Sequence, residues 1–211
     1  MADTLTLYTN PMSRGRIARW MLEEVGQPYE TIVLDYATTM KGPEYLAINP
    51  MGKVPAIKHG DVVVTECAAI CAYLADAFPR AGLAPPPNDK LRAPYYRWLF
   101  FAAGPLEAAV TNKAMGFSPP ADKEGMVGYG TFARVVDVLE AAVSNTPYLL
   151  GEKFSAADVY VGAHIGWGMQ FGSLEKRPAF EEYAGRILSR PAALKAREID
   201  DALVAQQQRQ G

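Results

Sequence analysis

Apolar residues near the start of the chain switch repeatedly between strand-like and helix-like spacing. Leu5 and Leu7 alternate with their neighbours as in a strand, and Ile17, Trp20 and Met21 then recur at helical spacing. The pattern predicts strands at 5–8, 29–34, 54–58 and 62–64, and helices at 13–25, 41–48 and 66–78. Strands and helices in this order predict a mixed sheet flanked by helices.

A proline-rich segment, PRAGLAPPP at 79–87, ends this alternation. Its three consecutive prolines can neither extend the preceding helix nor join a sheet. Beyond it the spacing is helical throughout and predicts helices at 91–110, 122–143, 155–169, 178–188 and 191–204. We therefore predict an α/β N-terminal domain at 1–80, a linker at 81–89 and an all-α C-terminal domain at 90–211.

One of the later helices carries a clear start signal. Ser155 and Asp158 have the spacing of a capping box, and Phe154 could pack on Val159 as a hydrophobic staple. These residues indicate a role in stabilising the helix rather than in catalysis. The same helix contains glycines that we expect to permit close helix packing rather than to bind a phosphate: Gly162, Gly166, Gly168 and Gly172.

Composition excludes several functional classes. A formal net charge of −2 over 211 residues leaves no basic surface for nucleic acid. No apolar stretch approaches the roughly 20 residues that span a bilayer, and the N-terminus is neither a signal nor a transit peptide. Cys67 and Cys71 make no disulfide framework, and two distant histidines offer no metal site. We expect a cytoplasmic protein with reduced thiols, no metal, and no nucleic-acid or membrane partner.

The segment from Val54 to the helix that begins near Glu66 is the most informative in the chain. Pro55 belongs at the start or edge of a strand, and Val54 before it keeps backbone groups that an extended peptide could pair with. Thr65 is a suitable N-cap, and the helix after it presents unpaired N–H groups to a carboxylate. Glu66 offers an anion for an ammonium group. Together these groups suit the headgroup of an α-amino acid within a peptide.

This constellation resembles the glutathione site of the cytosolic glutathione S-transferase family, in which a cis Val-Pro pair and a hairpin precede Glu-Ser or Gln-Ser at a helix start. Cys67 stands here where the family usually has Ser, which keeps the backbone N–H but supplies a weaker side-chain donor. The resemblance implies a thioredoxin-like N-terminal domain, glutathione as co-substrate without another cofactor, and a homodimer. It also implies that Lys53, Val54, Pro55, Glu66 and Cys67 bind glutathione.

A thiol needs help to ionise at neutral pH, because a cysteine thiol has a pKa near 8.5. Lowering it by about two units requires roughly 2.7 kcal/mol of preferential thiolate stabilisation, which a hydroxyl donor and a helix N-terminus can supply. Ser13, in the loop at 9–13, matches the serine pattern of bacterial family members and is the first candidate. Tyr8 is the rival, because the tyrosine-type classes carry a tyrosine at the end of this strand, and Asn10 is a third donor.

Each of these residues also has an ordinary structural interpretation. Ser13 could simply cap the first helix, and Tyr8 could be an aromatic residue of a strand. Arg14 and Arg16 could steer an anionic tripeptide, but the solvated face of a helix explains them better. Lys53 could pair with the glycine carboxylate of glutathione or simply be a solvated lysine.

An electrophile site is expected between the two domains, lined by adaptable apolar side chains that suit varied hydrophobic substrates. Its candidates are Met12, Tyr95, Tyr96, Phe100, Met115 and Phe117. The leading function is transfer of the glutathione thiolate to apolar electrophiles, as in detoxification. One alternative is a glutathione-dependent peroxidase or disulfide reductase, although the usual cysteine is missing from the first loop. The other is a non-catalytic dimer module that binds glutathione or an apolar ligand.

Overall fold

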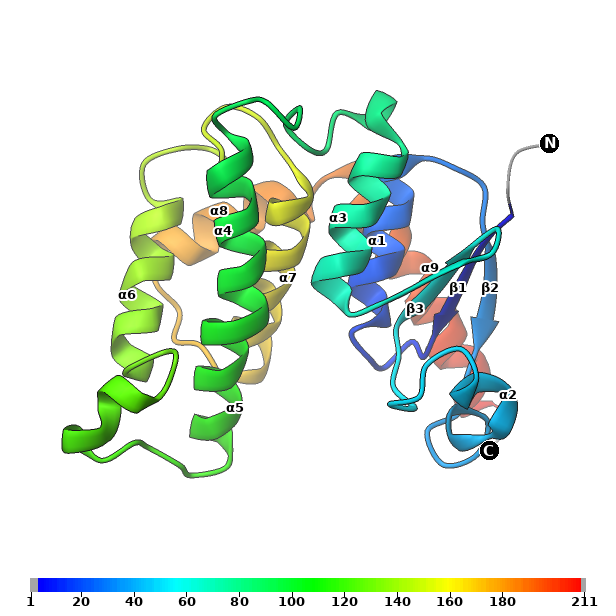
Figure 1. The fold of residues 1–211 in the computed structure, drawn as a ribbon, viewed down its shortest axis with the longest axis horizontal. Coiled ribbons are helices and arrows are strands. Elements are labelled where there is room, and N and C mark those ends of the chain that lie inside the picture. The colour runs from blue at the N-terminus through cyan, green and yellow to red at the C-terminus, as the bar shows by residue number, and fades with distance from the viewer. Residues whose placement is uncertain (1–3, 210–211) are drawn as a thin grey trace. The chain divides into compact units, whose positions relative to one another are not determined.

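The structure is a computed structural model that describes residues 4–209. These residues form two compact units (Figure 1). The first unit contains the described residues up to Ala81 together with those from Ser189 onward, and the second spans Gly82–Leu188. Within residues 4–209, no helix combines the length and the apolar character of a bilayer-spanning segment.

A four-stranded sheet lies at the centre of the first unit, in the order β2-β1-β3-β4. The strands are β1 at Leu5–Thr9, β2 at Glu30–Val33, β3 at Ala56–His59 and β4 at Val62–Thr65. β1 pairs in parallel with β2 and antiparallel with β3, and β3 pairs antiparallel with β4. Leu7 and Ile57, which face each other on the two central strands, are both fully buried. The predicted mixed sheet is therefore confirmed.

Helices pack around this sheet, and α1 and α3 lie side by side in Figure 1. The helical segments up to Ala81 are α1 at Gly15–Val25, the 3-10 turn η1 at Thr39–Lys41, α2 at Pro43–Leu46, α3 at Cys67–Ala77 and the 3-10 turn η2 at Pro79–Ala81. α1 ends at Gly26, whose left-handed φ of 70° closes the helix as predicted. The helix predicted at 41–48 is interrupted at the extended residue Gly42, because Pro43 starts a new helix there.

The last helix, α9 at Pro191–Gln208, packs against α1 in the first unit. Ion pairs cross this interface, and the buried one joins Arg19 Nε to Asp200 Oδ1 at 2.9 Å. The compact units therefore divide the chain differently from the predicted boundaries, which assigned all of 90–211 to one helical domain. Apolar spacing predicts that a segment is helical, but not the neighbour against which that helix packs.

The second unit is mostly helical, as predicted, and α7 packs against α4 and α8. Its helical segments are α4 at Arg92–Phe101, the π-helical turn η3 at Ala102–Leu106, α5 at Glu107–Ala114, the 3-10 turn η4 at Ala121–Met126, α6 at Phe132–Val143, α7 at Ala156–Phe171 and α8 at Pro178–Leu188. The helix predicted at 91–110 is divided by η3, which contains Pro105. A proline removes a backbone donor from the helical ladder, and a π turn absorbs the disruption.

The helix predicted at 122–143 begins only at Phe132. Thr131 is its N-cap, and the Thr131 side chain accepts a hydrogen bond from the Arg134 backbone N–H at 3.2 Å. The prediction was wrong for the preceding residues because glycines at 125, 128 and 130 disfavour a continuous helix.

The capping box predicted at Ser155 and Asp158 is present at the start of α7. Asp158 is fully buried and accepts hydrogen bonds from the backbone N–H groups of Ser155 and Leu149 and from the hydroxyl of Tyr183, each at 2.8 Å. Burial raises the pKa of the Asp158 carboxyl, and these donors oppose the rise. The carboxylate therefore joins the start of α7 to a preceding loop and to α8.

The close packing predicted for the glycines of α7 is also confirmed. A Cβ atom at Gly162 would collide with Ile187, and one at Gly166 would lie 2.9 Å from Leu188 Cδ1. Gly172 differs from these, because its left-handed φ of 73° ends the helix. The glycines thus let α8 approach α7 closely.

Candidate functional site

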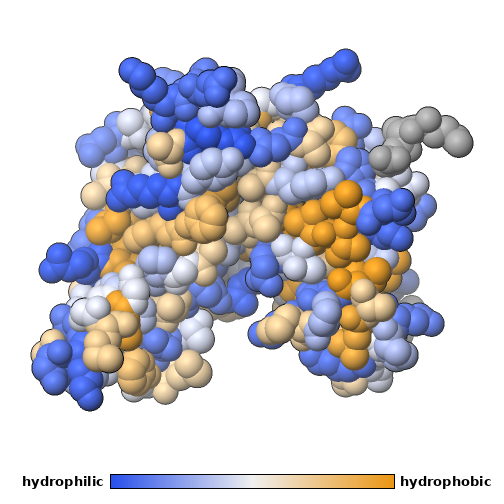
Figure 2. All heavy atoms as spheres, in the orientation of Figure 1, coloured by the Kyte–Doolittle hydropathy of each residue, from blue (hydrophilic) through white to orange (hydrophobic). Residues whose placement is uncertain are grey.

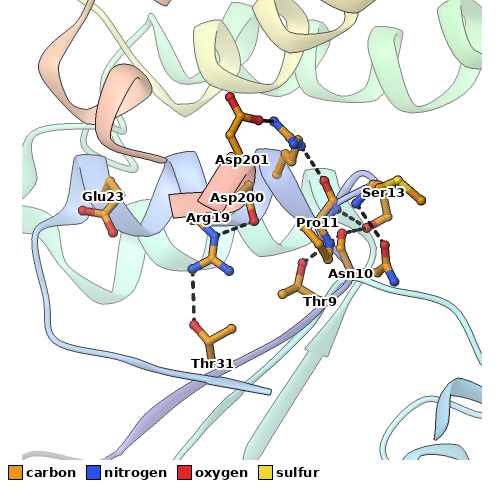
Figure 3. A network of polar contacts seen from close by, with 12 residues as sticks. Thr9, Asn10, Pro11, Ser13, Arg19, Glu23, Thr31, Asp200 and Asp201 are labelled. Carbon is orange, nitrogen blue, oxygen red and sulfur yellow. Dashed lines mark hydrogen bonds and ion pairs between the residues drawn. The ribbon is translucent and has the colours of Figure 1, made fainter. Parts of the chain in front are cut away.

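The loop between β1 and α1 is fixed by its own hydrogen bonds (Figure 3). Asn10 is buried, its Oδ1 accepts from the Met12 backbone N–H at 2.9 Å, and its Nδ2 donates to the Leu34 carbonyl at 2.8 Å. Another bond reaches the loop from α1, where Arg16 Nε donates to the Pro11 carbonyl at 2.5 Å. Asn10, predicted as a third donor to a thiolate, therefore has a structural role in shaping this loop.

Ser13 lies at the end of this loop, half-buried, just before α1. Its Oγ donates to the Asn10 carbonyl at 2.7 Å and accepts from the Gly15 backbone N–H at 2.9 Å. The hydroxyl thus satisfies an N–H group at the helix start, which is the structural role considered for it. Because a hydroxyl has one proton, Ser13 could donate to a thiolate only by releasing the Asn10 carbonyl.

Tyr8 belongs to an apolar cluster on the sheet. Its ring lies 5.7 Å from the ring of Tyr45, and both Tyr8 and Val54 pack against the buried residues of this cluster. The Tyr45 hydroxyl donates to the Lys53 carbonyl at 2.6 Å, and burial raises the pKa of Tyr45 to about 12. The structure therefore brings Tyr8 close to the segment that contains Val54, and Tyr45 remains a neutral donor there at physiological pH.

The Val54–Pro55 peptide bond is cis, as in the family that the sequence resembles. The bond precedes β3, and the Lys53 carbonyl before it accepts from Tyr45 and from Asn49 Nδ2, the latter at 2.8 Å. The Lys53 side chain is exposed. Backbone and buried side chains thus hold this segment, while the lysine ammonium group faces solvent.

Glu66 has an unusual backbone conformation at the start of α3. Its φ is 68° and its ψ is 121°, and among residues 4–209 it is the one non-glycine residue with a positive φ. Such a conformation costs about 1–3 kcal/mol and is often found at functional sites. The Glu66 side chain is exposed, and its carbonyl accepts the hydrogen bond from Ile70 N–H at 2.8 Å. In the β3–β4 register Ala56 faces Thr65, which places Val54–Pro55 beside Glu66.

Both cysteines are buried more deeply than the half-buried positions predicted for them. Cys67 is 7% exposed and Cys71 is 0% exposed. The Cys67 thiol donates to the Arg14 carbonyl at 3.5 Å, so this side chain contacts the start of α1. Burial, and to a smaller extent the neighbouring Cys67, raises the pKa of the Cys71 thiol well above its usual value. Neither thiol is placed as an accessible nucleophile.

The apolar candidates for the electrophile site fall in both compact units. Met12, in the first unit, has a side chain that is 68% exposed. In the second unit Tyr96 and Phe100 are exposed on α4, and Met115 and Phe117 are exposed after α5. Tyr95 is fully buried in the core of the second unit, so its inclusion among the candidates was wrong.

Arg16 has a structural role that the sequence did not reveal. It was interpreted as a solvated residue, but its guanidinium bonds the Pro11 carbonyl and pairs with Asp201 on α9 at 2.7 Å. Tyr36 was also missed, and its hydroxyl donates to the Met12 carbonyl at 3.2 Å. The contacts of Asp201 and Tyr36 have no local sequence signal, because both residues lie in segments that are separated from the loop along the chain.

Comparison with known proteins identifies the family to which these features belong. The model for the glutathione S-transferase N-terminal domain matches residues 3–76, and the model for the C-terminal domain matches residues 116–191. A glutathione S-transferase of Arabidopsis thaliana is 35% identical over 177 residues, which cover 76% of this chain and 78% of the relative. The disulfide-bond oxidoreductase YfcG of Escherichia coli is 30% identical over 208 residues, with 91% and 94% covered.

A solved structure extends the similarity to three dimensions. The glutathione S-transferase of a sphingomonad, determined in complex with glutathione, is similar with a TM-score of 0.76 at 28% identity, covering 93% of this chain and 98% of that one. The family models match both halves of the chain, and the similar structure shares its fold. The chain belongs to the glutathione S-transferase family.

Proposed function

We propose that this glutathione S-transferase transfers the thiolate of glutathione to apolar electrophiles. The observation that carries the proposal is the juxtaposition of the Val54–Pro55 segment with Glu66 at the start of α3. Backbone N–H groups in the first turn of α3 would bind the carboxylate of the γ-glutamyl headgroup, and Glu66 would pair with its ammonium. The rest of the tripeptide would pair with the backbone of Val54, as an added strand does. A similar protein has been solved with glutathione bound, which supports glutathione as the ligand of this chain.

The proposed chemistry needs a donor for the sulfur. In our proposal the Ser13 hydroxyl turns from the Asn10 carbonyl to the thiolate, and the start of α1 adds its favourable dipole. The thiolate then attacks the electrophilic carbon, a carbon–sulfur bond forms, and the leaving group departs with the bonding electrons. Lys53 is proposed to pair with the glycine carboxylate, and the backbone N–H of Cys67 is proposed to join the headgroup contacts. The proposed electrophile contacts are Met12, Tyr96, Phe100 and Met115, all exposed.

We expect Ser13→Ala to lower kcat about tenfold with a chlorinated nitrobenzene and to raise the pKa of bound glutathione, because one donor to the thiolate is lost. Ultraviolet absorbance of the bound thiolate against pH measures that pKa directly. Ser13→Thr, which keeps the hydroxyl, should have nearly the kcat of the wild type and nearly its pKa of bound glutathione. Tyr8→Phe is the matched test of the rival: if it abolishes turnover while Ser13→Ala does not, Ser13 is not the catalytic donor.

We expect Glu66→Gly and Glu66→Ala to weaken glutathione binding about tenfold, because both remove the anion proposed to hold the ammonium group. Their stabilities should differ. Glycine relieves the positive φ of this position, whereas alanine keeps the strain, so Glu66→Gly should unfold at the higher temperature of the two. Titration calorimetry with reduced glutathione measures the binding. If both variants bind reduced glutathione with the heat and affinity of the wild type, Glu66 does not contact glutathione.

Reduction of disulfides is a second candidate, because the E. coli relative is named a disulfide-bond oxidoreductase. Residues 9–13 contain no cysteine and both cysteines of the chain are buried, so the attacking thiolate would be that of glutathione. It would break the substrate disulfide, form a mixed disulfide with one sulfur and release the other as a thiolate. A second glutathione thiolate would then attack the mixed disulfide, giving oxidised glutathione and releasing the remaining substrate thiolate. The same variants, assayed with a small disulfide as substrate, separate this activity from conjugation.

We also propose that the protein is a cytoplasmic homodimer, as is typical of the family. Figure 2 shows hydrophobic atoms gathered over the β3–β4 hairpin of the first unit. Val62 and Val63 on the edge strand β4 are 49% and 39% exposed, and Met51 is 66% exposed. Exposed apolar residues on an edge strand favour coverage by a partner.

A further inference from the structure

The contact between α1 and α9 is rich in paired charges. As the residue number rises along α9, the number of its partner on α1 falls, so the two helices run antiparallel. The ion pairs are Arg190–Glu24, Lys195–Glu23, Asp200–Arg19 and Asp201–Arg16. Asp201 is the last acidic residue of this series and lies nearest the loop that carries Ser13 (Figure 3).

Arg16 connects this interface to the loop. Its Nε donates to the Pro11 carbonyl at 2.5 Å, and its Nη1 pairs with Asp201 Oδ1 at 2.7 Å. A guanidinium is planar, so a bond on each side fixes its orientation. The Arg16 side chain is 26% exposed, which is consistent with a side chain held between two partners rather than one extended into solvent.

We propose that Asp201 and Arg16 are positioning residues for the candidate site, and that they place the Pro11–Ser13 segment relative to β1. Asp201, on a helix anchored by the buried Arg19–Asp200 pair, holds the Arg16 guanidinium, which in turn holds the Pro11 carbonyl two residues before Ser13. The kinetic consequence rests on the proposed function, in which the Ser13 hydroxyl donates to the glutathione thiolate. A small displacement of a catalytic group has a large effect on rate.

A second ion pair in the same interface supplies a matched control. Lys195 Nζ pairs with Glu23 Oε2 at 2.7 Å, and the side chains of Lys195 and Asp201 are similarly exposed, at 64% and 57%. Glu23 also accepts a hydrogen bond from the Tyr29 hydroxyl at 2.6 Å, and neither residue belongs to the loop that carries Ser13. Lys195→Ala therefore removes an α1–α9 ion pair without touching the contacts of Pro11.

The test compares Asp201→Ala with Lys195→Ala in the full chain. Asp201→Ala should raise the rate of backbone hydrogen exchange at Met12 and Ser13 several-fold, because these N–H groups are bonded within the loop. It should also lower kcat about fivefold and raise the pKa of bound glutathione. Asp201→Glu should stay close to the wild type in exchange rate, kcat and the pKa of bound glutathione. Lys195→Ala should match the wild type in all three. Thermal unfolding confirms that every variant is folded.

A double-mutant comparison tests the route through Arg16. If Asp201 acts by holding Arg16, Asp201→Ala should have no further effect on exchange or kcat in an Arg16→Ala background. Additive effects, or exchange in Asp201→Ala equal to that in Lys195→Ala, would overturn the proposal. If exchange accelerates as expected while Ser13→Ala leaves the bound thiol pKa unchanged, the positioning role holds and the catalytic assignment of Ser13 fails.

Discussion

Asp158→Ala is expected to reduce the free energy of unfolding by about 3–5 kcal/mol, the largest stability loss that we predict for a single substitution. The carboxylate accepts from Leu149, Ser155 and Tyr183, and truncation would leave those donors buried without an acceptor. Because Asp158 is 0% exposed, water cannot replace it without opening the core. For a chain of 211 residues, this corresponds to a lowering of Tm by roughly 10 °C.

Thermal or urea unfolding followed by circular dichroism measures this effect. Asp137→Ala is the matched control, because Asp137 also lies on a helix and bonds an arginine, Arg177, at 2.9 Å, but its side chain is 67% exposed. An exposed pair of this kind contributes less than about 1 kcal/mol. Equal losses in the two variants would show that burial of the capping carboxylate does not decide its contribution. Asp158→Asn, which keeps one acceptor oxygen, should fall between them.

Gly15→Ala is expected to lower kcat/KM about a hundredfold and to destabilise the protein by about 2 kcal/mol. A Cβ at this position would collide with Thr9 Oγ1 and would lie 3.0 Å from both Thr9 Cβ and Ser13 Oγ. Thr9 is fully buried and branched at Cβ, so it has little freedom to move away. The added methyl group should therefore push apart the end of β1 and the start of α1, and displace Ser13.

Gly185→Ala provides the matched comparison. Gly185 lies in α8, and a Cβ there would have no atom within 4 Å. Alanine favours a helix over glycine by about 1 kcal/mol, so this variant should be slightly more stable and fully active. Steady-state kinetics and thermal unfolding of both variants test the prediction. Full activity in Gly15→Ala would mean that the β1–α1 junction tolerates displacement.

The elements of the fold were largely predictable from the sequence, because α1 and the central strands β1 and β3 bury apolar residues whose spacing the sequence records. The failures have local causes. Pro43 divided a predicted helix after Gly42, and Pro105 introduced a π turn into another. The packing of α9 on α1 was not predictable, since Asp200 and Arg19 are far apart along the chain and each resembles a solvated charge.

The candidate site was predictable where backbone chemistry demands particular residues. The Val54–Pro55 pair and an acid at a helix start are signals of this kind, and the structure places them side by side. The positive φ of Glu66 had no signal, because glutamate rarely adopts it and only the surrounding structure imposes it. The orientation of the Ser13 hydroxyl could not be predicted either, since it depends on where the Asn10 carbonyl lies.

The position of α9 has a consequence for biosynthesis. All of Gly82–Leu188 is translated after β1–β4 and before the helix that covers α1. Until that helix leaves the ribosome, Arg19 has no carboxylate from Asp200 beside it, and the half of the molecule translated first is incomplete. The intervening helices can assemble during this interval, because domains fold as units during synthesis. The first unit, which contains Ser13, is therefore completed after the second unit during synthesis.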